Sequence, residues 1–414
     1  MIDMALLRGE RSEVVQTAIL KKDPDFNVKR LVELDNAVRK LRNKIEELRA
    51  ERNKLALLAS GGVTEEVRSK SIEVGKAIKE KEKSIIDIEK EFKALALRCP
   101  NILFEDVPAG NKEANKVVKT WGEKPKFAFQ PQNHLQLNES LEWFDFETAA
   151  KMSGAQFALY RKDAVKLMYA LTRIMLKHNA ENGFEPVLPP FLVNNAAMVK
   201  NGSLPKFEGD FYSTKEDDLS LIPTAEVTLT NMYADSILDQ KKLPLRHTAW
   251  TSCFRQEAGG YGASERGLIR IHQFEKVELY SFCEPEKSEE ELKFIVNVAE
   301  GLLQKLGLHY QVSLLAAQDT SFVSAKTYDL EVWLPGQGAF YEVSSCSNVA
   351  DFQARRAKIR FRLPESKGVK LVHTLNGSSL ALPRLVVALM ETYQKSDGTI
   401  KLPDIIKKEM DFLW

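Results

Sequence analysis

The sequence predicts an α+β protein: an antiparallel β-sheet flanked by helices forms the main domain, and an antiparallel α-helical coiled-coil arm precedes it. Apolar residues repeat with heptad spacing over residues 27–97, which is typical of long helices packed along a narrow seam. Segments with period-two alternation cluster between residues 250 and 363 with few helices between them, which favours an antiparallel sheet. Neither G-x-G-x-x-G after a strand nor G-x-x-x-x-G-K-[ST] occurs, so the common nucleotide fingerprints of parallel sheets do not apply.

The composition is that of a globular protein from a reducing compartment. The 414 residues are 44% hydrophobic and 28% charged, and this length predicts two or more domains. No apolar run approaches the roughly 18 residues of a membrane helix, and the first residues have no secretory pattern, so a cytoplasmic protein with no membrane partner is expected. The cysteines lie too far apart for a metal knuckle and no HExxH occurs, so no zinc is expected. They are Cys99, Cys253, Cys283 and Cys346.

A long helical hairpin is predicted over residues 27–97, within an N-terminal domain of residues 1–99. One apolar series runs from Leu31 to Leu55, and a second follows with the same steps of three and four residues. Two glycines end the first helix, and a threonine before two glutamates begins the second. The short turn makes the helices antiparallel neighbours, each roughly 45 Å long at 1.5 Å per residue. Too few apolar residues remain on the outer faces to pack against a globular body, so the arm is expected to project into solvent.

The hairpin region carries an excess of positive charge. Residues 27–99 contain 18 Lys and Arg against 13 Asp and Glu, whereas the whole chain has a formal net charge of only +1. A solvated helix surface explains most such charge runs. A polyanionic partner or a protein-interaction role is the alternative, and the residues of the arm alone leave these readings open.

Residues 100–130 are predicted to be a linker, because turn-forming and charged residues dominate them. The domain that follows, residues 131–414, mixes helices and strands. Periodicity of 3.6 predicts amphipathic helices over residues 164–182 and 292–306. The clearest period-two strands are residues 274–280 and 327–334.

The chemistry is densest in residues 253–274. Arg255 and Glu257 are two apart on a predicted strand, so their side chains share a side, and a glycine-rich loop containing Arg266 follows. A guanidinium fork suits a phosphate or carboxylate, and Phe274 suits stacking on a base. A β-hairpin with surface ion pairs would explain a lone Arg and Glu, but it does not explain the whole segment.

This segment resembles motif 2 of class II aminoacyl-tRNA synthetases, which here spans about residues 253–280. Residues 375–394 resemble motif 3, and residues 183–190 resemble motif 1, the dimer-forming element. Three further signals resemble the seryl-specific family of the bacterial type, over essentially the whole chain. They are Thr224-Ala-Glu226, the stretch Tyr341-Glu-Val-Ser-Ser-Cys-Ser-Asn348 and the N-terminal arm.

The resemblance implies roles for individual residues. Arg255 would contact the α-phosphate of ATP and the serine carboxylate, Glu257 the adenine amine, and Phe274 with Arg384 would sandwich the adenine. The implied ATP-binding set is Arg255, Gln256, Glu257, Arg266, Phe274, Glu342, Val343, Ser344, Ser345 and Arg384. The implied serine-binding set is Thr224, Ala225, Glu226, Arg255, Glu278 and Ser378. The implied catalytic residues are Arg255, Glu342 and Arg384, and Glu342 with Ser345 would ligate the Mg²⁺ that accompanies ATP.

Elementary chemistry agrees with a site of this composition. The serine carboxylate attacks the α-phosphate and pyrophosphate leaves, so no protein nucleophile is needed and catalysis is positioning plus charge neutralisation. A buried carboxylate such as Glu278 accepts from both the ammonium and the hydroxyl of serine, whereas alanine would leave it unpaired. On their own, Glu278 and Thr224 would read as a structural ion pair and a turn residue. The group that takes the proton in the transfer step stays open.

The resemblance implies ATP, L-serine and tRNA(Ser) as partners, a homodimer, and an arm that grips the long variable arm of the tRNA. Charging of tRNA(Sec) stays open. Two alternatives remain: an amino acid ligase that loads a carrier protein, and a non-catalytic coiled-coil paralogue. The long arm counts against the first, and the intact Arg255, Glu257, Glu342 and Arg384 count against the second. Motif 3 departs from the family at Ser379 and Pro383, where glycines are frequent.

Overall fold

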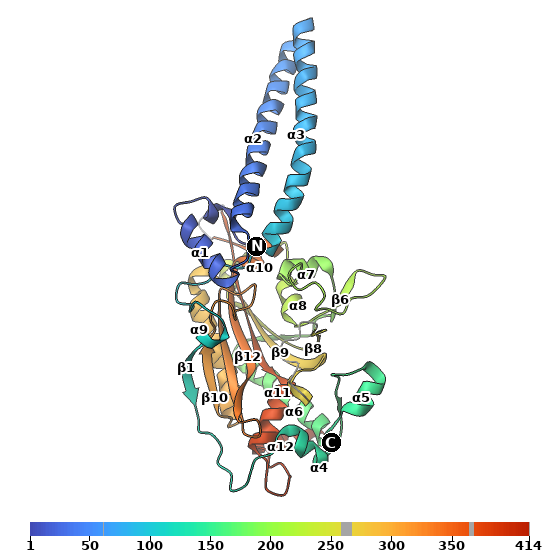
Figure 1. Ribbon diagram of the computed structural model, residues 1–414, viewed down its shortest axis with the longest axis vertical. Coiled ribbons are helices and arrows are strands. Elements are labelled where there is room, and N and C mark those ends of the chain that lie inside the picture. The colour runs from blue at the N-terminus through green and yellow to red at the C-terminus, as the bar shows by residue number, and fades with distance from the viewer. Residues whose placement is uncertain (61, 258–266, 364–367, 414) are drawn as a thin grey trace. The chain divides into compact units, whose positions relative to one another are not determined.

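The structure is a computed structural model that describes residues 1–60, 62–257, 267–363 and 368–413 (Figure 1). The chain divides into two compact units, Met1–Pro100 and Asn101–Trp414. None of the described helices is both long enough and apolar enough to cross a membrane.

The first unit is dominated by two long helices, α2 (Val28–Ala59) and α3 (Glu65–Arg98), after η1 (Met4–Leu7) and α1 (Ser12–Lys22). Asn27 and Thr64 cap them, because each side-chain oxygen accepts a backbone N–H from the first turn. The two helices run antiparallel, because ion pairs between them join Arg30 to Glu91, Arg42 to Glu89 and Arg49 to Glu82. The predicted coiled-coil hairpin is therefore confirmed. Its buried seam contains Leu31, Leu34, Val38, Ile45, Leu55, Val74, Ile78 and Ile85.

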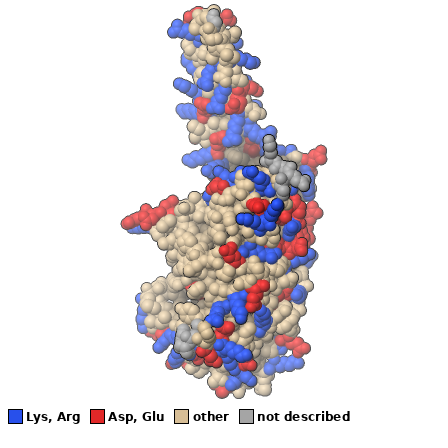
Figure 2. Space-filling view, turned by 180° about the vertical axis from the view of Figure 1, so that it is seen from behind, with Lys and Arg blue, Asp and Glu red and all other residues tan. Residues whose placement is uncertain are grey.

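Surface charges of the arm alternate in sign along the two helices (Figure 2). The ion pairs between them are largely exposed, so water and salt screen them and they add little to the stability of the hairpin. Packing of the apolar seam must therefore hold the hairpin together.

The second unit is built on an eight-stranded sheet with the order β1-β10-β11-β12-β15-β9-β8-β4. Every neighbouring pair is antiparallel except β4 with β8, which is parallel. The predicted antiparallel sheet is thus confirmed. The strands are β1 (Lys116–Trp121), β10 (Tyr310–Leu314), β11 (Lys326–Leu334), β12 (Ala339–Ala350), β15 (His373–Ala381), β9 (Gln273–Cys283), β8 (Leu245–Phe254) and β4 (Glu185–Val187).

The edge strand β1 lies inside residues 100–130, for which the sequence predicts only a linker. Five of its six side chains are exposed, so it has no apolar alternation by which a strand is recognised. It pairs with β10 through backbone hydrogen bonds, and the pattern of apolar and polar side chains in the sequence does not predict that pairing. This segment therefore belongs to the sheet as well as connecting two parts of the chain.

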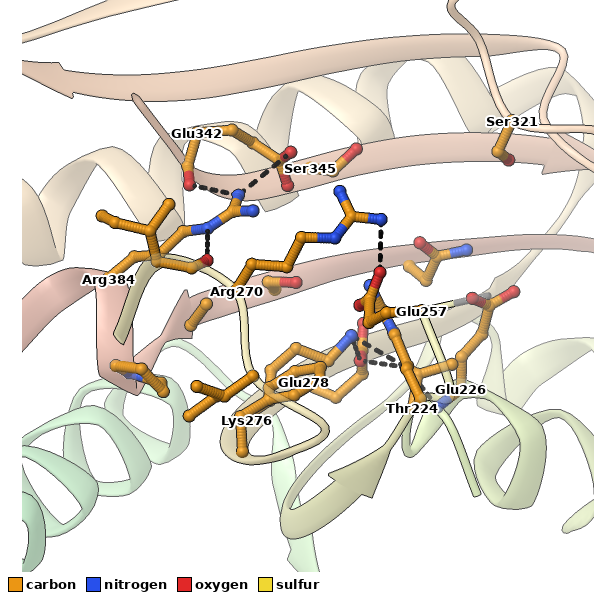
Figure 3. A pocket seen from close by; sticks show the side chains of 18 of the residues that line it. Thr224, Glu226, Glu257, Arg270, Lys276, Glu278, Ser321, Glu342, Ser345 and Arg384 are labelled. Carbon is orange, nitrogen blue, oxygen red and sulfur yellow. Dashed lines mark hydrogen bonds and ion pairs between the residues drawn. The ribbon is translucent and has the colours of Figure 1, made fainter. Parts of the chain in front are cut away.

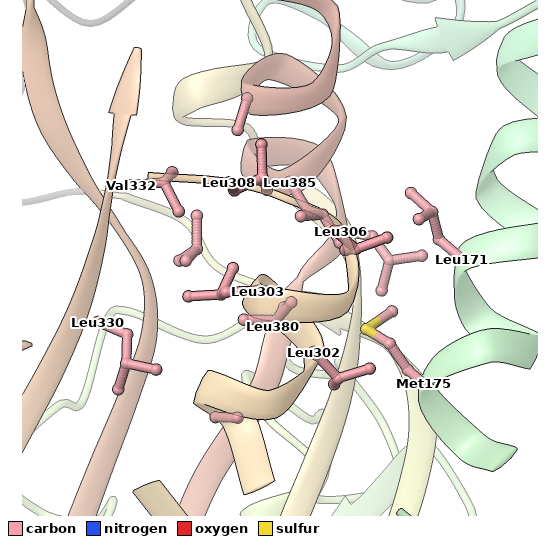
Figure 4. Close-up of a cluster of buried hydrophobic side chains, with 14 of the residues drawn as sticks. Leu171, Met175, Leu302, Leu303, Leu306, Leu308, Leu330, Val332, Leu380 and Leu385 are labelled. Carbon is pink, nitrogen blue, oxygen red and sulfur yellow. The ribbon is translucent and has the colours of Figure 1, made fainter. Parts of the chain in front are cut away.

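Helices pack against the sheet, and the hydrophobic core lies between them and the strands (Figures 1 and 4). The predicted amphipathic helices appear as α6 (Asp163–Glu181) and α9 (Ser288–Lys305), and α11 (Leu382–Thr392) is buried along almost its whole length. Their apolar faces meet strands β11 and β15 in a cluster that includes Leu171, Met175, Leu302, Leu303, Leu330, Leu380 and Leu385. This core fixes the strands whose other face carries the pocket described below.

Smaller elements complete the unit. They are η2 (Lys112–Ala114), α4 (His134–Leu141), β2 (Phe144–Asp145), α5 (Phe146–Ser153), β3 (Leu159–Tyr160), β5 (Leu192–Asn194), α7 (Asn195–Asn201), β6 (Leu219–Leu221), α8 (Glu226–Asn231), β7 (Ile237–Asp239), η3 (Gln240–Lys242), η4 (Gly267–Ile269), η5 (Pro285–Lys287), α10 (Phe352–Ala357), β13 (Arg360–Arg362), β14 (Val369–Leu371) and α12 (Asp404–Leu413).

Candidate active site

A polar pocket of about 440 Å³ opens on the sheet in the second unit (Figure 3). Strands β9, β12 and β15 form its floor, and the starts of α8 and α11 close two of its sides. Most of the predicted site residues line it, namely Thr224, Glu226, Arg255, Glu257, Phe274, Glu278, Glu342, Ser345, Ser378 and Arg384. Residues from four separate stretches of sequence thus meet in one cavity.

One end of the pocket is a buried carboxylate corner. The Thr224 hydroxyl donates to Glu278 Oε2 at 2.7 Å, and Lys276 Nζ lies 2.7 Å from the same oxygen and 2.8 Å from Thr224 Oγ1. Glu278 is 2% exposed and Ser378 faces it from the neighbouring strand. The corner therefore presents a desolvated anion and hydroxyls, a combination suited to a small ligand with an ammonium and a hydroxyl.

A second carboxylate, Glu226, lies beside this corner. Its Oε1 accepts hydrogen bonds from Asn201 at 3.2 Å and from Gln353 at 2.6 Å. Burial, together with the negative charge of Glu278, raises the pKa of Glu226 to about 7. Near neutral pH this group therefore carries a proton part of the time.

The opposite end of the pocket is cationic and aromatic. The Arg255 guanidinium lies 5.0 Å from the centre of the Phe274 ring, which is cation–π distance. Arg384 donates from Nε to the Ile269 carbonyl at 3.1 Å and from Nη1 to the Glu342 carbonyl at 2.8 Å. Both guanidiniums line the cavity, so this end can receive a planar base and phosphates.

Oxygen donors gather where β11 pairs with β12. Asp329 faces Ser345 across the two strands, and Glu342 Oε2 lies 3.4 Å from Arg384 Nη1. Asp329 is 9% exposed, and its Oδ1 has no hydrogen-bond partner among the described residues. Burial and the nearby Glu342 hold the pKa of Asp329 well above its usual range. Hard oxygen donors with an orphaned buried carboxylate oxygen fit a divalent cation such as Mg²⁺.

Several residues named from the sequence do not line this pocket. Ala225 and Val343 are buried, Gln256 donates to the Phe211 carbonyl at 2.8 Å, and the Ser344 hydroxyl donates to the Ser378 carbonyl. These side chains support the pocket from behind. Arg266 lies outside the described residues.

Two pocket cations have no role in the sequence prediction. Arg270 forms an ion pair with Glu257, the carboxylate expected to hold an adenine amine, and Lys276 joins the corner at Glu278. A signal for Lys276 was available, because it alternates with Phe274 and Glu278 on one strand and must share their face. Arg270 lies in an irregular stretch between η4 and β9, where periodicity gives no direction.

Comparisons with known proteins match both units of the chain. A family model described as seryl-tRNA synthetase N-terminal domain matches residues 1–103, and one described as tRNA synthetase class II core domain (G, H, P, S and T) matches residues 206–393. The serine–tRNA ligase of Leptospira biflexa is 44% identical over 98% of this chain and 99% of its own. That of Geobacter sulfurreducens is also 44% identical, over 99% and 98%.

Solved structures agree. The seryl-tRNA synthetase of Pyrococcus horikoshii complexed with ATP superposes with a TM-score of 0.94 at 36% identity, covering 100% of this chain and 98% of that one. The cytoplasmic serine–tRNA ligase of Naegleria fowleri in complex with AMP gives 0.87 at 25% identity, covering 99% and 97%.

Proposed function

This chain belongs to the seryl-tRNA synthetase family, and from that premise we propose how its pocket performs the reaction of a serine–tRNA ligase. The enzyme activates L-serine with ATP to give seryl-adenylate and pyrophosphate, and then transfers the seryl group to the 3′ end of tRNA(Ser). One observation supports the proposal above the others. A buried anionic corner and a cationic aromatic end face each other in a single cavity.

In the first step a serine carboxylate oxygen attacks the α-phosphorus, the new P–O bond forms, and the bond to the pyrophosphate oxygen breaks. Arg255, at the cationic end of the pocket, neutralises both the serine carboxylate and the α-phosphate. Phe274 and Arg384 hold the adenine between them. Glu257 accepts a hydrogen bond from the adenine amine once its ion pair with Arg270 is broken. Rate enhancement comes from positioning and charge stabilisation, so no side-chain nucleophile is required.

Glu342 and Ser345 would hold the Mg²⁺ that accompanies ATP, with Asp329 behind them. Bound there, the ion supplies charge neutralisation on the phosphates. Arg384 Nη1 donates to two oxygens of Glu342, the backbone carbonyl and the carboxylate Oε2. The same arginine therefore orders the carboxylate and faces the nucleotide.

Serine selection rests on Glu278, Thr224 and Ser378, with Glu226 alongside. The substrate ammonium and hydroxyl both find acceptors in this corner. Alanine would leave a buried acceptor unpaired, which costs more than the loss of the hydroxyl group alone. Threonine keeps the hydroxyl and adds a methyl group, so it would have to be refused by steric crowding in this corner.

We also propose the assembly and the tRNA contact. Residues 183–190 form a dimer interface, and two features support this: β4 ends the sheet, and Leu188 is 77% exposed. The positive excess of the arm supports a grip on the tRNA backbone outside the anticodon. The enzyme would work in the cytoplasm as a homodimer.

Amino-acid-dependent ATP–pyrophosphate exchange with serine, threonine, alanine and glycine tests the proposal. Exchange with serine alone, followed by charging of tRNA(Ser), is the expected result. Exchange without tRNA charging would favour a ligase that loads a carrier protein. No exchange in the folded protein would favour the coiled-coil scaffold and overturn the proposal.

A further inference from the structure

Lys276 occupies an unusual place in the pocket. Its ammonium contacts Glu278 Oε2 at 2.7 Å and Thr224 Oγ1 at 2.8 Å, and those two atoms are themselves 2.7 Å apart (Figure 3). Lys276 is 7% exposed, and Glu278 is 2% exposed. An ammonium group thus already sits on the two acceptors that the proposed function gives to the ammonium of serine.

The position of Lys276 along its strand adds a second fact. Phe274, Lys276 and Glu278 alternate on β9 and line the pocket together. Side chains two residues apart on a strand are separated by about 7 Å. Lys276 therefore arises midway between the residue for the adenine and the residue for serine, at the level where the α-phosphate must lie.

Two ammonium groups do not fit on one carboxylate oxygen without repulsion at low dielectric. A buried carboxylate with no cation is also costly, so an empty pocket needs a positive charge at Glu278. A lysine answers both demands, because its ammonium is a compact charge on a flexible stem and can move between two anions.

We propose that Lys276 is a charge placeholder: it holds the ammonium site on Glu278 and Thr224 until serine displaces it, and then turns to the α-phosphate. This inference rests on the proposed function. When serine binds, the Lys276 ammonium moves to the reacting phosphate. Without serine, it stays on Glu278 and Thr224. Lys276 thus couples serine binding to activation.

The test compares two ligands in wild type and Lys276→Met by titration calorimetry. L-Serine carries the ammonium that competes with Lys276, whereas 3-hydroxypropanoate lacks it and would bind with Lys276 still in place. In Lys276→Met, serine should bind as tightly as in wild type or several-fold more tightly. Binding of 3-hydroxypropanoate should weaken at least threefold, and the rate of adenylate formation should fall at least tenfold.

The exposed Lys293→Met on α9 is the matched control and should leave both affinities unchanged. Weakening of both ligands by a similar factor in Lys276→Met would overturn the placeholder and make Lys276 a fixed part of the serine site. Failure of wild type to bind or activate serine would instead overturn the proposed function, so the two failures are distinguishable.

A measurement on the unaltered enzyme covers the case in which the variant does not fold. Acetylation of Lys276 by acetic anhydride, followed by peptide mass spectrometry, should be accelerated by serine, since displacement frees the amine from Glu278. Protection of Lys276 by serine would contradict displacement.

Discussion

Ser378 lies directly opposite Glu278 where β15 pairs antiparallel with β9. The pairing brings a hydroxyl and a carboxylate from residues one hundred positions apart onto the same buried patch of the pocket. A β-bulge between Ser378 and Ala381 follows, and the Ser379 hydroxyl donates to Asn179 at 2.9 Å, away from Glu278. The Ser379 hydroxyl therefore bonds to a buried side chain of α6 and not to Glu278.

Glu278→Gln should abolish serine selection. An amide has no negative charge for the ammonium and has one acceptor oxygen where the carboxylate has two, so kcat/KM for serine-dependent exchange should fall by about 10²-fold or more. The exposed Glu290→Gln makes the same change in charge on α9 and should behave as wild type. Near-normal exchange in a folded Glu278→Gln enzyme would contradict the assignment of the corner.

Arg255→Ala should lower the rate of adenylate formation by about 10²- to 10³-fold, as expected on removal of a preorganised charge at a reacting phosphate. Arg255→Lys should recover little, because lysine cannot contact two groups with a planar fork. Single-turnover kinetics measure the step directly, and circular dichroism checks folding. The exposed Arg362→Ala is the control. Normal rates in Arg255→Ala would remove this residue from the mechanism.

Glu226→Gln should change how stability depends on pH. Because the pKa of Glu226 is raised to about 7 in the folded protein, the folded state holds the proton more tightly than the unfolded state. The wild type should therefore lose stability as pH rises from about 4.5 to about 7, on the order of 3 kcal/mol from this group. Glutamine at 226 removes the loss, so its melting temperature relative to wild type should be higher at pH 8 than at pH 5. An equal difference at both pH values would refute the argument.

Glu342→Gln should raise the Mg²⁺ concentration needed for half-maximal exchange, because one anionic oxygen donor is lost. Titration of Mn²⁺ followed by electron paramagnetic resonance, with ATP present, measures the ion directly. Glu289→Gln, an exposed acid on α9, is the matched control. An unchanged metal requirement would assign the ion to other donors.

Replacement of residues 27–97 by a short Gly-Ser linker should leave serine-dependent exchange intact and abolish charging of tRNA(Ser). The hairpin is held by its own seam, and all the residues that line the pocket lie in the second unit. Loss of exchange in this variant would show that activation depends on the arm.

The fold was predictable where side chains repeat. The seam of α2 and α3, the amphipathic faces of α6 and α9 and the alternation of β9 and β11 all follow from spacing, and the structure confirms them. Strand β1 was missed because an edge strand with exposed side chains has no pattern to read. The bulge after Ser378 was also beyond reach, since register depends on the neighbouring strand.

In the candidate site, the sequence predicted which residues line the pocket better than it predicted which side chains contact one another. Arg255, Glu278 and Glu342 do line one pocket. The contacts that these residues make, above all the ion pair of Lys276 with Glu278, depend on distances in three dimensions. Spacing along the chain does not give those distances. Their roles toward ATP and serine stay predictions until the variants above are measured.

The position of β15 in the sheet has a consequence for synthesis of the enzyme. It joins two half-sheets, one of β1 and β10–β12 and the other of β4, β8 and β9, and the pocket takes Glu342 from the first half and Glu278 from the second. Among the described strands, β15 is the last to be synthesised. Until then the growing polypeptide on the ribosome has two open inner strand edges and no complete active site. A chain that ends before β15 would therefore be inactive and prone to aggregation.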